Sequence, residues 1–215
     1  MSLFPQTKFI KSAHEPEQFT PDRGREVAFA GRSNSGKSSA INAILNRRGL
    51  ARTSKTPGRT QLVNFFDLGD NRRVVDLPGY GYAKVPRKVQ EHWGHLMETY
   101  FTGRRSLSGL ILIMDVRFPM TEYDGQMLSW TEASRCPTHI LLTKSDKLSR
   151  GAGSQVLQKV EHRLGQHHSA QLFSATKKTG VEEARDVLER MLETKTNGKQ
   201  EAGSGKKPLP GTGHQ

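Results

Sequence analysis

The sequence lacks the features that mark secreted and membrane proteins. It has one cysteine, Cys136, among 215 residues, which excludes an internal disulfide framework and a cysteine-based zinc site. Its longest apolar run, around Leu110–Met114, falls far short of the ~20 residues that a membrane span needs. The opening segment, MSLFPQTKFIKS, has no apolar signal core. We therefore expect a soluble, cytoplasmic protein without stable membrane insertion, in which Cys136 has no catalytic role.

Apolar and acidic residues are also scarce. Hydrophobic residues make up 33% of the chain, and the mean hydropathy is −0.66, so part of the chain should lie outside any core. The 33 Lys and Arg residues outnumber the 21 Asp and Glu residues, giving a net charge of +12. This excess suits a nucleic acid or an anionic membrane, although charge can also serve solubility alone. A local cluster of five bases without an acid lies between Asn46 and Thr60: Arg47, Arg48, Arg52, Lys55 and Arg59.

The chain divides by composition into a lead-in at 1–24, one domain at 25–194 and a flexible basic tail at 195–215. Within the lead-in, the Pro- and Glu-rich stretch from residue 12 is expected to be a loop. Strands are expected at Val27–Ala30, Val63–Leu68, Val74–Asp76, Gly109–Asp115, Thr138–Thr143 and Gln171–Ser174. Apolar stripes at helical spacing lie within 40–45, 85–100, 156–164 and 181–192. The alternation predicts a three-layer α/β fold with a mostly parallel six-stranded sheet, one antiparallel edge pair and helices on both faces.

The strongest motif is GRSNSGKS at Gly31–Ser38, which fits GxxxxGK[ST] between an expected strand and an expected helix. Its glycines let backbone N–H groups close around phosphate oxygens, and the following helix points its positive end at them. Lys37 can reach the β- and γ-phosphates, and the Ser38 hydroxyl can bind Mg²⁺. The motif predicts a nucleotide site.

Three further motifs follow strands in an order that suits a nucleotide switch. In Asp76-Leu77-Pro78-Gly79, Asp76 can hold Mg²⁺ through water and Gly79 can offer its N–H to a γ-phosphate. In the second motif, TKSD at 143–146, the Asp146 carboxylate can accept from guanine N1–H and N2–H₂, which adenine does not present, while the Lys144 stem lies along the base. The third motif, SAT at 174–176, can supply a backbone N–H to guanine O6.

Together the segments GRSNSGKSS, SKTPGRTQ, DLPGYGYA and LLTKSDKL resemble the EngB/YihA group of small bacterial GTPases, in the TrmE-Era-EngA-YihA-Septin-like class of translation-factor-related P-loop GTPases. The resemblance runs from about Val27 to Leu192. It implies a Ras-like P-loop domain that binds GTP and GDP, with switch I at 46–60 and switch II at 79–87. Members of the group are implicated in late assembly of the large ribosomal subunit and in normal cell division and septation.

The resemblance also implies roles for individual residues. The catalytic residues would be Lys37, Thr60 and Gly79, and the Mg²⁺ ligands would be Ser38, Thr60 and Asp76. The nucleotide would be bound by Gly31, Arg32, Ser33, Asn34, Ser35, Gly36, Lys37, Ser38, Gly58, Arg59, Thr60, Gln61, Leu62, Asp76, Leu77, Pro78, Gly79, Thr143, Lys144, Ser145, Asp146, Ser174, Ala175 and Thr176.

Two residues depart from the common GTPase pattern. Thr143 stands where many GTPases have an Asn, so we expect one hydrogen bond to the base, weaker affinity and a retained choice of guanine. Tyr80 follows Gly79 where many have a Gln that orients the attacking water, and a tyrosine ring cannot do this, so slow intrinsic turnover should follow. Asn34 occupies the loop position at which related GTPases hold a potassium ion, which makes K⁺ a candidate activator.

The leading hypothesis is a monomeric, GTP-driven switch whose basic switch I meets ribosomal RNA of the large subunit. Further bases expected on that surface are Lys84, Arg87, Lys88, Arg104 and Arg105. One alternative is a division-linked or membrane-proximal regulator; another is a P-loop ATPase or kinase. His92 and His95 share a helix face, but no nearby acid in the sequence completes a metal site, so we expect a solvated or RNA-facing surface there.

Overall fold

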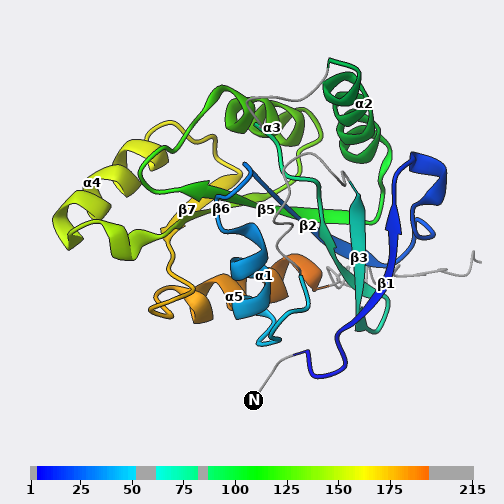
Figure 1. Ribbon diagram of the computed structural model, residues 1–215, viewed down its shortest axis with the longest axis horizontal. Coiled ribbons are helices and arrows are strands. Elements are labelled where there is room, and N and C mark those ends of the chain that lie inside the picture. The colour runs from blue at the N-terminus through cyan, green and yellow to red at the C-terminus, as the bar shows by residue number, and fades with distance from the viewer. Residues whose placement is uncertain (1–3, 52–61, 82–86, 194–215) are drawn as a thin grey trace, which may run out of the picture.

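The computed structural model describes residues 4–51, 62–81 and 87–193. A seven-stranded sheet, ordered β1-β3-β4-β2-β5-β6-β7, forms its centre (Figure 1). The strands are β1 (Lys8–Ala13), β2 (Arg25–Gly31), β3 (Val63–Gly69), β4 (Arg72–Asp76), β5 (Leu107–Asp115), β6 (Thr138–Thr143) and β7 (His168–Leu172). The α-helices are α1 (Lys37–Ile44), α2 (Arg87–Gly103), α3 (Glu122–Ala133), α4 (Arg150–Glu161) and α5 (Val181–Leu192), with 3₁₀ turns η1 (Pro16–Gln18) and η2 (Ser145–Lys147).

Helices cover both faces of the sheet, because the central strands are apolar on both sides. Along β2, Val27 and Phe29 pack against α1 and α5, whereas Ala28 and Ala30 belong to the core beneath α2 and α3. Figure 1 shows α1 and α5 below the sheet and α2 and α3 above it. The predicted α/β class with helices on both faces is confirmed.

The predicted strand count of six is wrong, because the N-terminal segment adds β1 to the sheet. This strand pairs antiparallel with β3, which in turn pairs antiparallel with β4. Thus β3 alone runs against the other strands. Most of β1 is exposed, including Phe9 and Ile10 at 54% and 41%. A solvent-facing edge strand leaves no strong apolar alternation in the sequence, which is why this segment was predicted as a lead-in.

Two other elements differ from expectation for the same kind of reason. β7 spans His168–Leu172 rather than Gln171–Ser174, and its start was missed because its first residues, His168 and Ser169, are polar and lie in a half-covered edge strand. α3 was not predicted, since its buried face carries Asp124 and Thr131 beside Met127. Its start is fixed by Thr121, whose hydroxyl accepts from the Asp124 N–H in a capping box.

A buried charge cluster joins β2 to the end of α2. Glu26 is fully buried and accepts hydrogen bonds from Arg73 Nε (3.1 Å), Arg104 Nε (2.7 Å) and the Tyr100 hydroxyl (3.1 Å). The Arg104 side chain is only 7% exposed. The expectation that Arg104 extends an RNA-facing surface is therefore wrong, because this guanidinium neutralises Glu26 inside the domain, whereas the Arg105 side chain is 88% exposed.

Cys136 is buried, and burial raises the pKa of its thiol to about 12. This agrees with a thiol that has no catalytic role. In the described part of the chain, no helix has both the length and the apolar character that a membrane crossing requires.

Candidate nucleotide-binding site

The loop of the first motif joins the end of β2 to the start of α1. Its geometry needs glycine at Gly31, where a Cβ would lie 2.7 Å from the Ile113 carbonyl oxygen and 2.8 Å from Ser35 Oγ. Gly36 has φ +99° immediately before α1, in the left-handed region that favours glycine. These two positions let the chain reverse tightly and direct the first N–H groups of α1 toward the loop.

Lys37 and Asp76 meet although they come from different motifs. Asp76 ends β4, which lies beside β2, and its Oδ1 forms an ion pair with Lys37 Nζ. Both side chains are largely buried, at 12% and 8% exposure. Ser38 is the next residue of α1, so the sheet order brings the predicted phosphate and Mg²⁺ motifs to one edge, at the carboxyl ends of parallel strands.

The DLPGY segment runs beside the loop as an extension of the sheet. Leu77 N–H donates to Phe29 O (3.0 Å), and Ser33 N–H donates to Tyr80 O (2.8 Å). A Cβ on Gly79 would lie 3.6 Å from Ser33 Cα, in ordinary contact. Gly79 is therefore adjacent to the phosphate loop, as its proposed role requires.

Tyr80 turns away from the loop into the helical layer. Its hydroxyl donates to Asp124 Oδ1 at 2.5 Å, and its ring lies 5.8 Å from that of Trp93 and 6.0 Å from that of Tyr123. The residue is 3% exposed, and burial, with the adjacent Asp124 carboxylate, raises the pKa of its hydroxyl well above 10.0. Tyr80 thus has a structural role that joins the DLPGY segment to α3.

The two predicted base-reading motifs lie together after β6 and β7. Ser145 N–H donates to Phe173 O (3.1 Å), and the buried Ser174 hydroxyl donates to Asp146 Oδ1 (2.6 Å). This hydrogen bond is the main cause that lowers the pKa of Asp146, so the carboxylate stays ionised as an acceptor. Ala175 and Thr176 continue from Ser174 into a turn.

The Thr143 hydroxyl bonds to backbone carbonyls of neighbouring segments. It is 3% exposed, and its hydroxyl lies within hydrogen-bonding reach of Ser35 O and of Met114 O, the latter at 3.0 Å. A hydroxyl has one hydrogen, so it serves one carbonyl at a time. The expected hydrogen bond from Thr143 to guanine is therefore not supported; the side chain instead ties the phosphate loop to β5 and β6.

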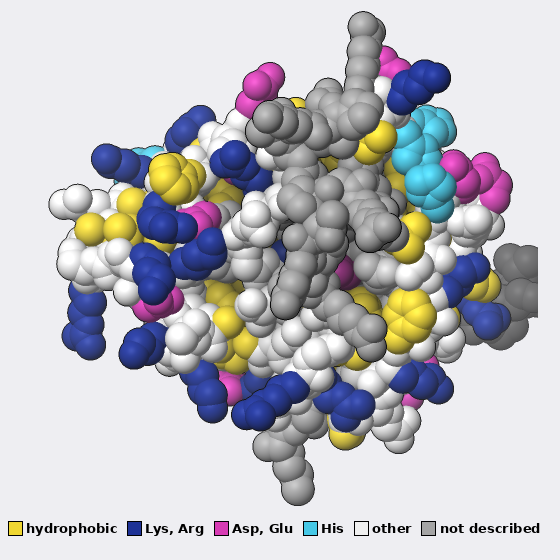
Figure 2. Space-filling model, in the orientation of Figure 1, with side chains coloured by type: hydrophobic (Ala, Val, Ile, Leu, Met, Phe, Trp, Pro, Cys, Tyr) yellow, Lys and Arg dark blue, Asp and Glu magenta, His cyan; other side chains and the backbone are white. Residues whose placement is uncertain are grey.

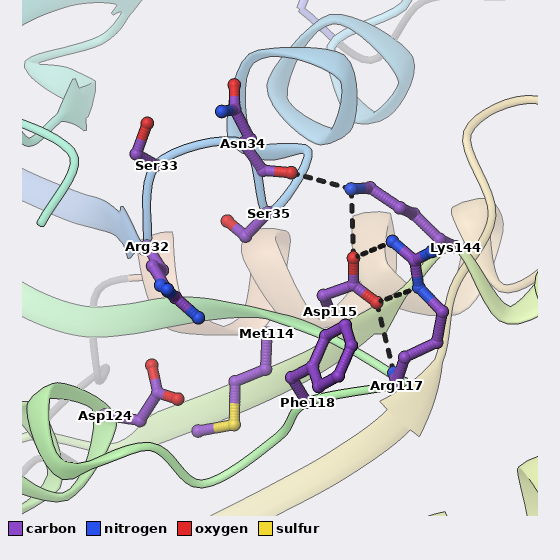
Figure 3. Close-up of a pocket in the computed structure, with 10 residues that line it drawn as sticks. All are labelled: Arg32, Ser33, Asn34, Ser35, Met114, Asp115, Arg117, Phe118, Asp124 and Lys144. Carbon is purple, nitrogen blue, oxygen red and sulfur yellow. Dashed lines mark hydrogen bonds and ion pairs between the residues drawn. The ribbon is translucent and has the colours of Figure 1, made fainter. Parts of the chain in front are cut away.

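Lys144 also contacts the loop, through a network that the sequence did not reveal (Figure 3). Its ammonium donates to Asn34 O (2.7 Å) and pairs with Asp115 Oδ2 (3.0 Å). Arg117 donates to both oxygens of the same carboxylate, from Nε to Oδ1 at 2.9 Å and from Nη2 to Oδ2 at 2.7 Å. These hydrogen bonds are the main cause of the lowered pKa of Asp115. The available signal for Asp115 was its position at the carboxyl end of a buried parallel strand, where ligands and their supports gather.

A pocket of about 170 Å³ opens beside the loop, lined by Arg32, Ser33, Asn34, Ser35, Met114, Asp115, Arg117, Phe118, Asp124 and Lys144 (Figure 3). It is smaller than most ligand sites, and neither Lys37 nor Asp146 lines it. The pocket is therefore not the whole predicted site. Of the other predicted residues, Gly58, Arg59, Thr60 and Gln61 lie outside the described residues, as do Arg52, Lys55, Lys84 and the tail, whereas Leu62 is described and half-buried.

Comparison with known proteins identifies the family and the fold. A family model described as "50S ribosome-binding GTPase" matches residues 26–144. Among solved structures, a probable GTP-binding protein engB has a TM-score of 0.65 and 19% identity, covering 78% of this chain and 98% of that one. Era from Aquifex aeolicus, bound to GDP·AlF4⁻, has a TM-score of 0.59 and 15% identity over 79% of this chain and 57% of its own. A bacterial selenocysteine-specific elongation factor, EF-Sec, has a TM-score of 0.55 and 19% identity over 79% and 29%.

The fold and site define a P-loop GTPase domain that binds and hydrolyses GTP. The chain belongs to the family of 50S ribosome-binding GTPases, whose model covers more than half of it. The EngB-type resemblance drawn from the motifs is confirmed at the level of the family and the fold.

Proposed function

We propose that this chain is a GTP-driven switch in the assembly of the large ribosomal subunit. The observation that carries the switch is the backbone contact between the phosphate loop and the DLPGY segment, Ser33 N–H to Tyr80 O at 2.8 Å, and the family description, "50S ribosome-binding GTPase", supports the ribosomal partner. Because Tyr80 also contacts Asp124 of α3, a change at the phosphates reaches the helical layer through one residue. Nucleotide-dependent ordering of such segments is how P-loop switches change their surfaces.

The Lys37–Asp76 ion pair supports a switch with a magnesium site. A bound phosphate would compete for Lys37, leaving the Asp76 carboxylate as a free oxygen ligand. Together with the Ser38 hydroxyl, it forms the oxygen donor set that Mg²⁺ prefers. We assign Ser38 and Asp76 to the ion, with Thr60 as the switch I ligand; bound Mg²⁺ would neutralise developing phosphate charge.

Slow intrinsic hydrolysis follows from the position of Tyr80. Its hydroxyl is committed to Asp124 and its ring is buried, so it offers no group to orient water. Asn34 is exposed, and its side chain points away from Asp115 in Figure 3. There it would help to hold a K⁺ ion that takes the place of an arginine finger. Equal turnover in sodium and potassium would reject the potassium part of the proposal.

The proposed partner is ribosomal RNA or protein of the large subunit. Lys and Arg side chains are prominent on the left and lower parts of the face in Figure 2, and the net charge is +12. Arg48 is exposed in the turn after α1, whereas Arg47 donates to the Pro5 and Thr7 carbonyls at 3.3 and 3.2 Å. Arg48 is therefore the cleaner probe of the surface. A division and septation defect in cells would follow from poor ribosome supply.

Sedimentation with large ribosomal subunits tests the partner. We expect binding with a non-hydrolysable GTP analogue and little with GDP, at one fixed moderate salt. Arg48→Glu should weaken binding roughly tenfold, and Arg163→Glu, a matched reversal at an exposed arginine after α4, should change it less. Equal losses of binding in both variants would show that the interaction depends on overall charge and not on the surface around Arg48. No binding in any state would refute the ribosome assignment and favour the division-linked regulator, for which liposome flotation is the next measurement.

The choice of guanine has its own test. The Asp146 carboxylate accepts hydrogen bonds, whereas an amide at this position can also donate one. Asp146→Asn should therefore weaken the binding of GTP and strengthen the binding of XTP, whose base carries a carbonyl where guanine has its amino group. An unchanged preference for GTP over XTP would remove Asp146 from base recognition.

A further inference from the structure

Two histidines and a glutamate, far apart in the sequence, come together where the N-terminal segment meets α2. His14 follows β1, Glu15 precedes η1, and His92 lies in the first half of α2. One ligand atom from each of the three residues lies within 4.8 Å of the other two. The expectation from the sequence concerned His92 together with His95, whereas the fold brings His92 to His14 and Glu15.

His14 lies close to each of the other two residues. The imidazole ring centroids of His14 and His92 lie 4.4 Å apart, and His92 Nε2 lies 3.1 Å from the His14 carbonyl oxygen. His14 Nε2 lies 3.9 Å from Glu15 Oε1, and these two side chains are 56% and 47% exposed. At the upper right of Figure 2, histidine side chains lie next to acidic ones at the surface.

The backbone under the cluster is held in place. Gln18 Oε1 accepts from both His14 N–H (2.7 Å) and Glu15 N–H (3.2 Å), which fixes the turn between β1 and η1. On the other side, Trp93, the residue after His92, is 7% exposed and packs in the core. Only side-chain rotations would therefore be needed to converge three ligands on one ion.

We propose that His14, Glu15 and His92 form a site for a divalent transition metal, with Zn²⁺ as the reference ion. Two imidazole nitrogens and a carboxylate oxygen suit Zn²⁺, and three protein ligands plus water is a recurrent coordination for it. Zn–N bonds of about 2.0–2.1 Å place tetrahedral ligand atoms roughly 3.3 Å apart, so the 3.9 Å gap closes with a small rotation of exposed side chains. Imidazole ligands favour Zn²⁺, Ni²⁺ and Cu²⁺ over Mg²⁺.

A bound ion would tie the N-terminal segment to α2. This helix begins at Arg87, a few residues after the DLPGY segment that contacts the phosphate loop. The ion would therefore stabilise the helical layer that Tyr80 joins. The site is independent of the nucleotide machinery, and its test requires neither GTP nor ribosomes.

Zn²⁺ titration of the full chain by calorimetry, without nucleotide and with no histidine tag, tests the site. We expect about one high-affinity Zn²⁺ per chain, a higher unfolding temperature with Zn²⁺ but not with Mg²⁺, and visible d–d absorption with Co²⁺. His92→Ala should lower the affinity at least about tenfold. His95→Ala, an exposed histidine one turn further along α2, should leave it unchanged.

Three results would overturn the assignment: no Zn²⁺ binding tighter than that of Mg²⁺, an unchanged affinity in His92→Ala, or an equal loss in His95→Ala, which would place the ion on the helix alone. Glu15→Gln covers the case in which His92→Ala fails to fold. It keeps both imidazoles and their contact, and it should still weaken Zn²⁺ binding. If Glu15→Gln binds Zn²⁺ as the wild type does, the carboxylate is not a ligand and the three-residue site is refuted.

Discussion

Tyr80→Phe removes a single hydroxyl from the buried contact between the DLPGY segment and α3. In the wild type, that hydroxyl donates to Asp124 Oδ1 at 2.5 Å, and Asp124 is 2% exposed. The other carboxylate oxygen, Oδ2, already accepts from Thr121 N–H and the Thr121 hydroxyl, both at 2.8 Å. The variant therefore leaves Oδ1 as a buried charged acceptor without its donor, while the ring stays in place.

The expected cost follows from that geometry. A hydrogen bond to a charged group contributes about 1.5–3 kcal/mol, and the loss is at the high end when the partner stays buried. We expect Tyr80→Phe to lower the free energy of unfolding by about 2–3 kcal/mol. GDP affinity should change less than about threefold, because the main-chain bond from Ser33 to Tyr80 remains and a threefold change is under 1 kcal/mol.

Urea unfolding measures this cost: the midpoint should shift to lower urea concentration while the m-value stays constant. Tyr123→Phe is the matched control, since Tyr123 contacts the same Tyr80 ring but is 38% exposed; it should cost less than about 0.5 kcal/mol. Equal costs in the two variants would refute the Tyr80–Asp124 contact as a stabilising one. A tenfold loss of GDP affinity in Tyr80→Phe would refute the assumption that the main-chain bond from Ser33 to Tyr80 is enough to hold the loop for GDP.

Three further outcomes are expected. Thr143→Val should weaken GDP binding by about fivefold in a fluorescent-nucleotide assay, because the loop loses a buried hydrogen bond worth about 1 kcal/mol, whereas Thr143→Ser should stay near the wild type. Burial lowers the pKa of His139 below its ordinary value of 6.5. The unfolded state therefore takes up a proton first, and the free energy of unfolding falls as the pH drops through 6.5. Measured by urea unfolding, the loss of stability between pH 7 and 5.5 should be smaller in His139→Gln than in the wild type. With its thiol buried and its pKa raised to about 12, Cys136 should react with a thiol reagent at the rate of unfolding and not as a free thiol.

The nucleotide site could be predicted from the sequence because its chemistry is carried by short contiguous motifs. A phosphate loop needs glycines at fixed positions, and Gly31 and Gly36 occupy the places where the chain packs closest or has positive φ. Asp76 and Asp146 follow apolar strands, and the ends of parallel strands meet at one sheet edge. At these residues the short sequence motif also fixes the place in the sheet, so the site could be predicted without knowing any contact between distant residues.

What the sequence could not provide were contacts between segments with weak local signals. Glu26 and Arg104 are 78 residues apart, and only the folded chain shows that they pair inside the domain. His14 and His92 are equally distant, with one on an exposed edge and the other on a helix. Thr143 could be assigned to the site but not to its correct partner, because a hydroxyl suits a base and a carbonyl equally well.

These contacts give the phosphate loop three supports of different kinds. Tyr80 O accepts from Ser33 at one side, the Thr143 hydroxyl holds the Ser35 carbonyl beneath, and Lys144 holds that of Asn34 at the other side. The last two supports come from the end of β6 and the residue after it, whereas the first comes from the DLPGY segment, whose Tyr80 contacts α3. In the switch proposed above, a nucleotide-dependent change at Ser33 would therefore pass through Tyr80 to its partner Asp124 in α3, on the side of the loop away from β6.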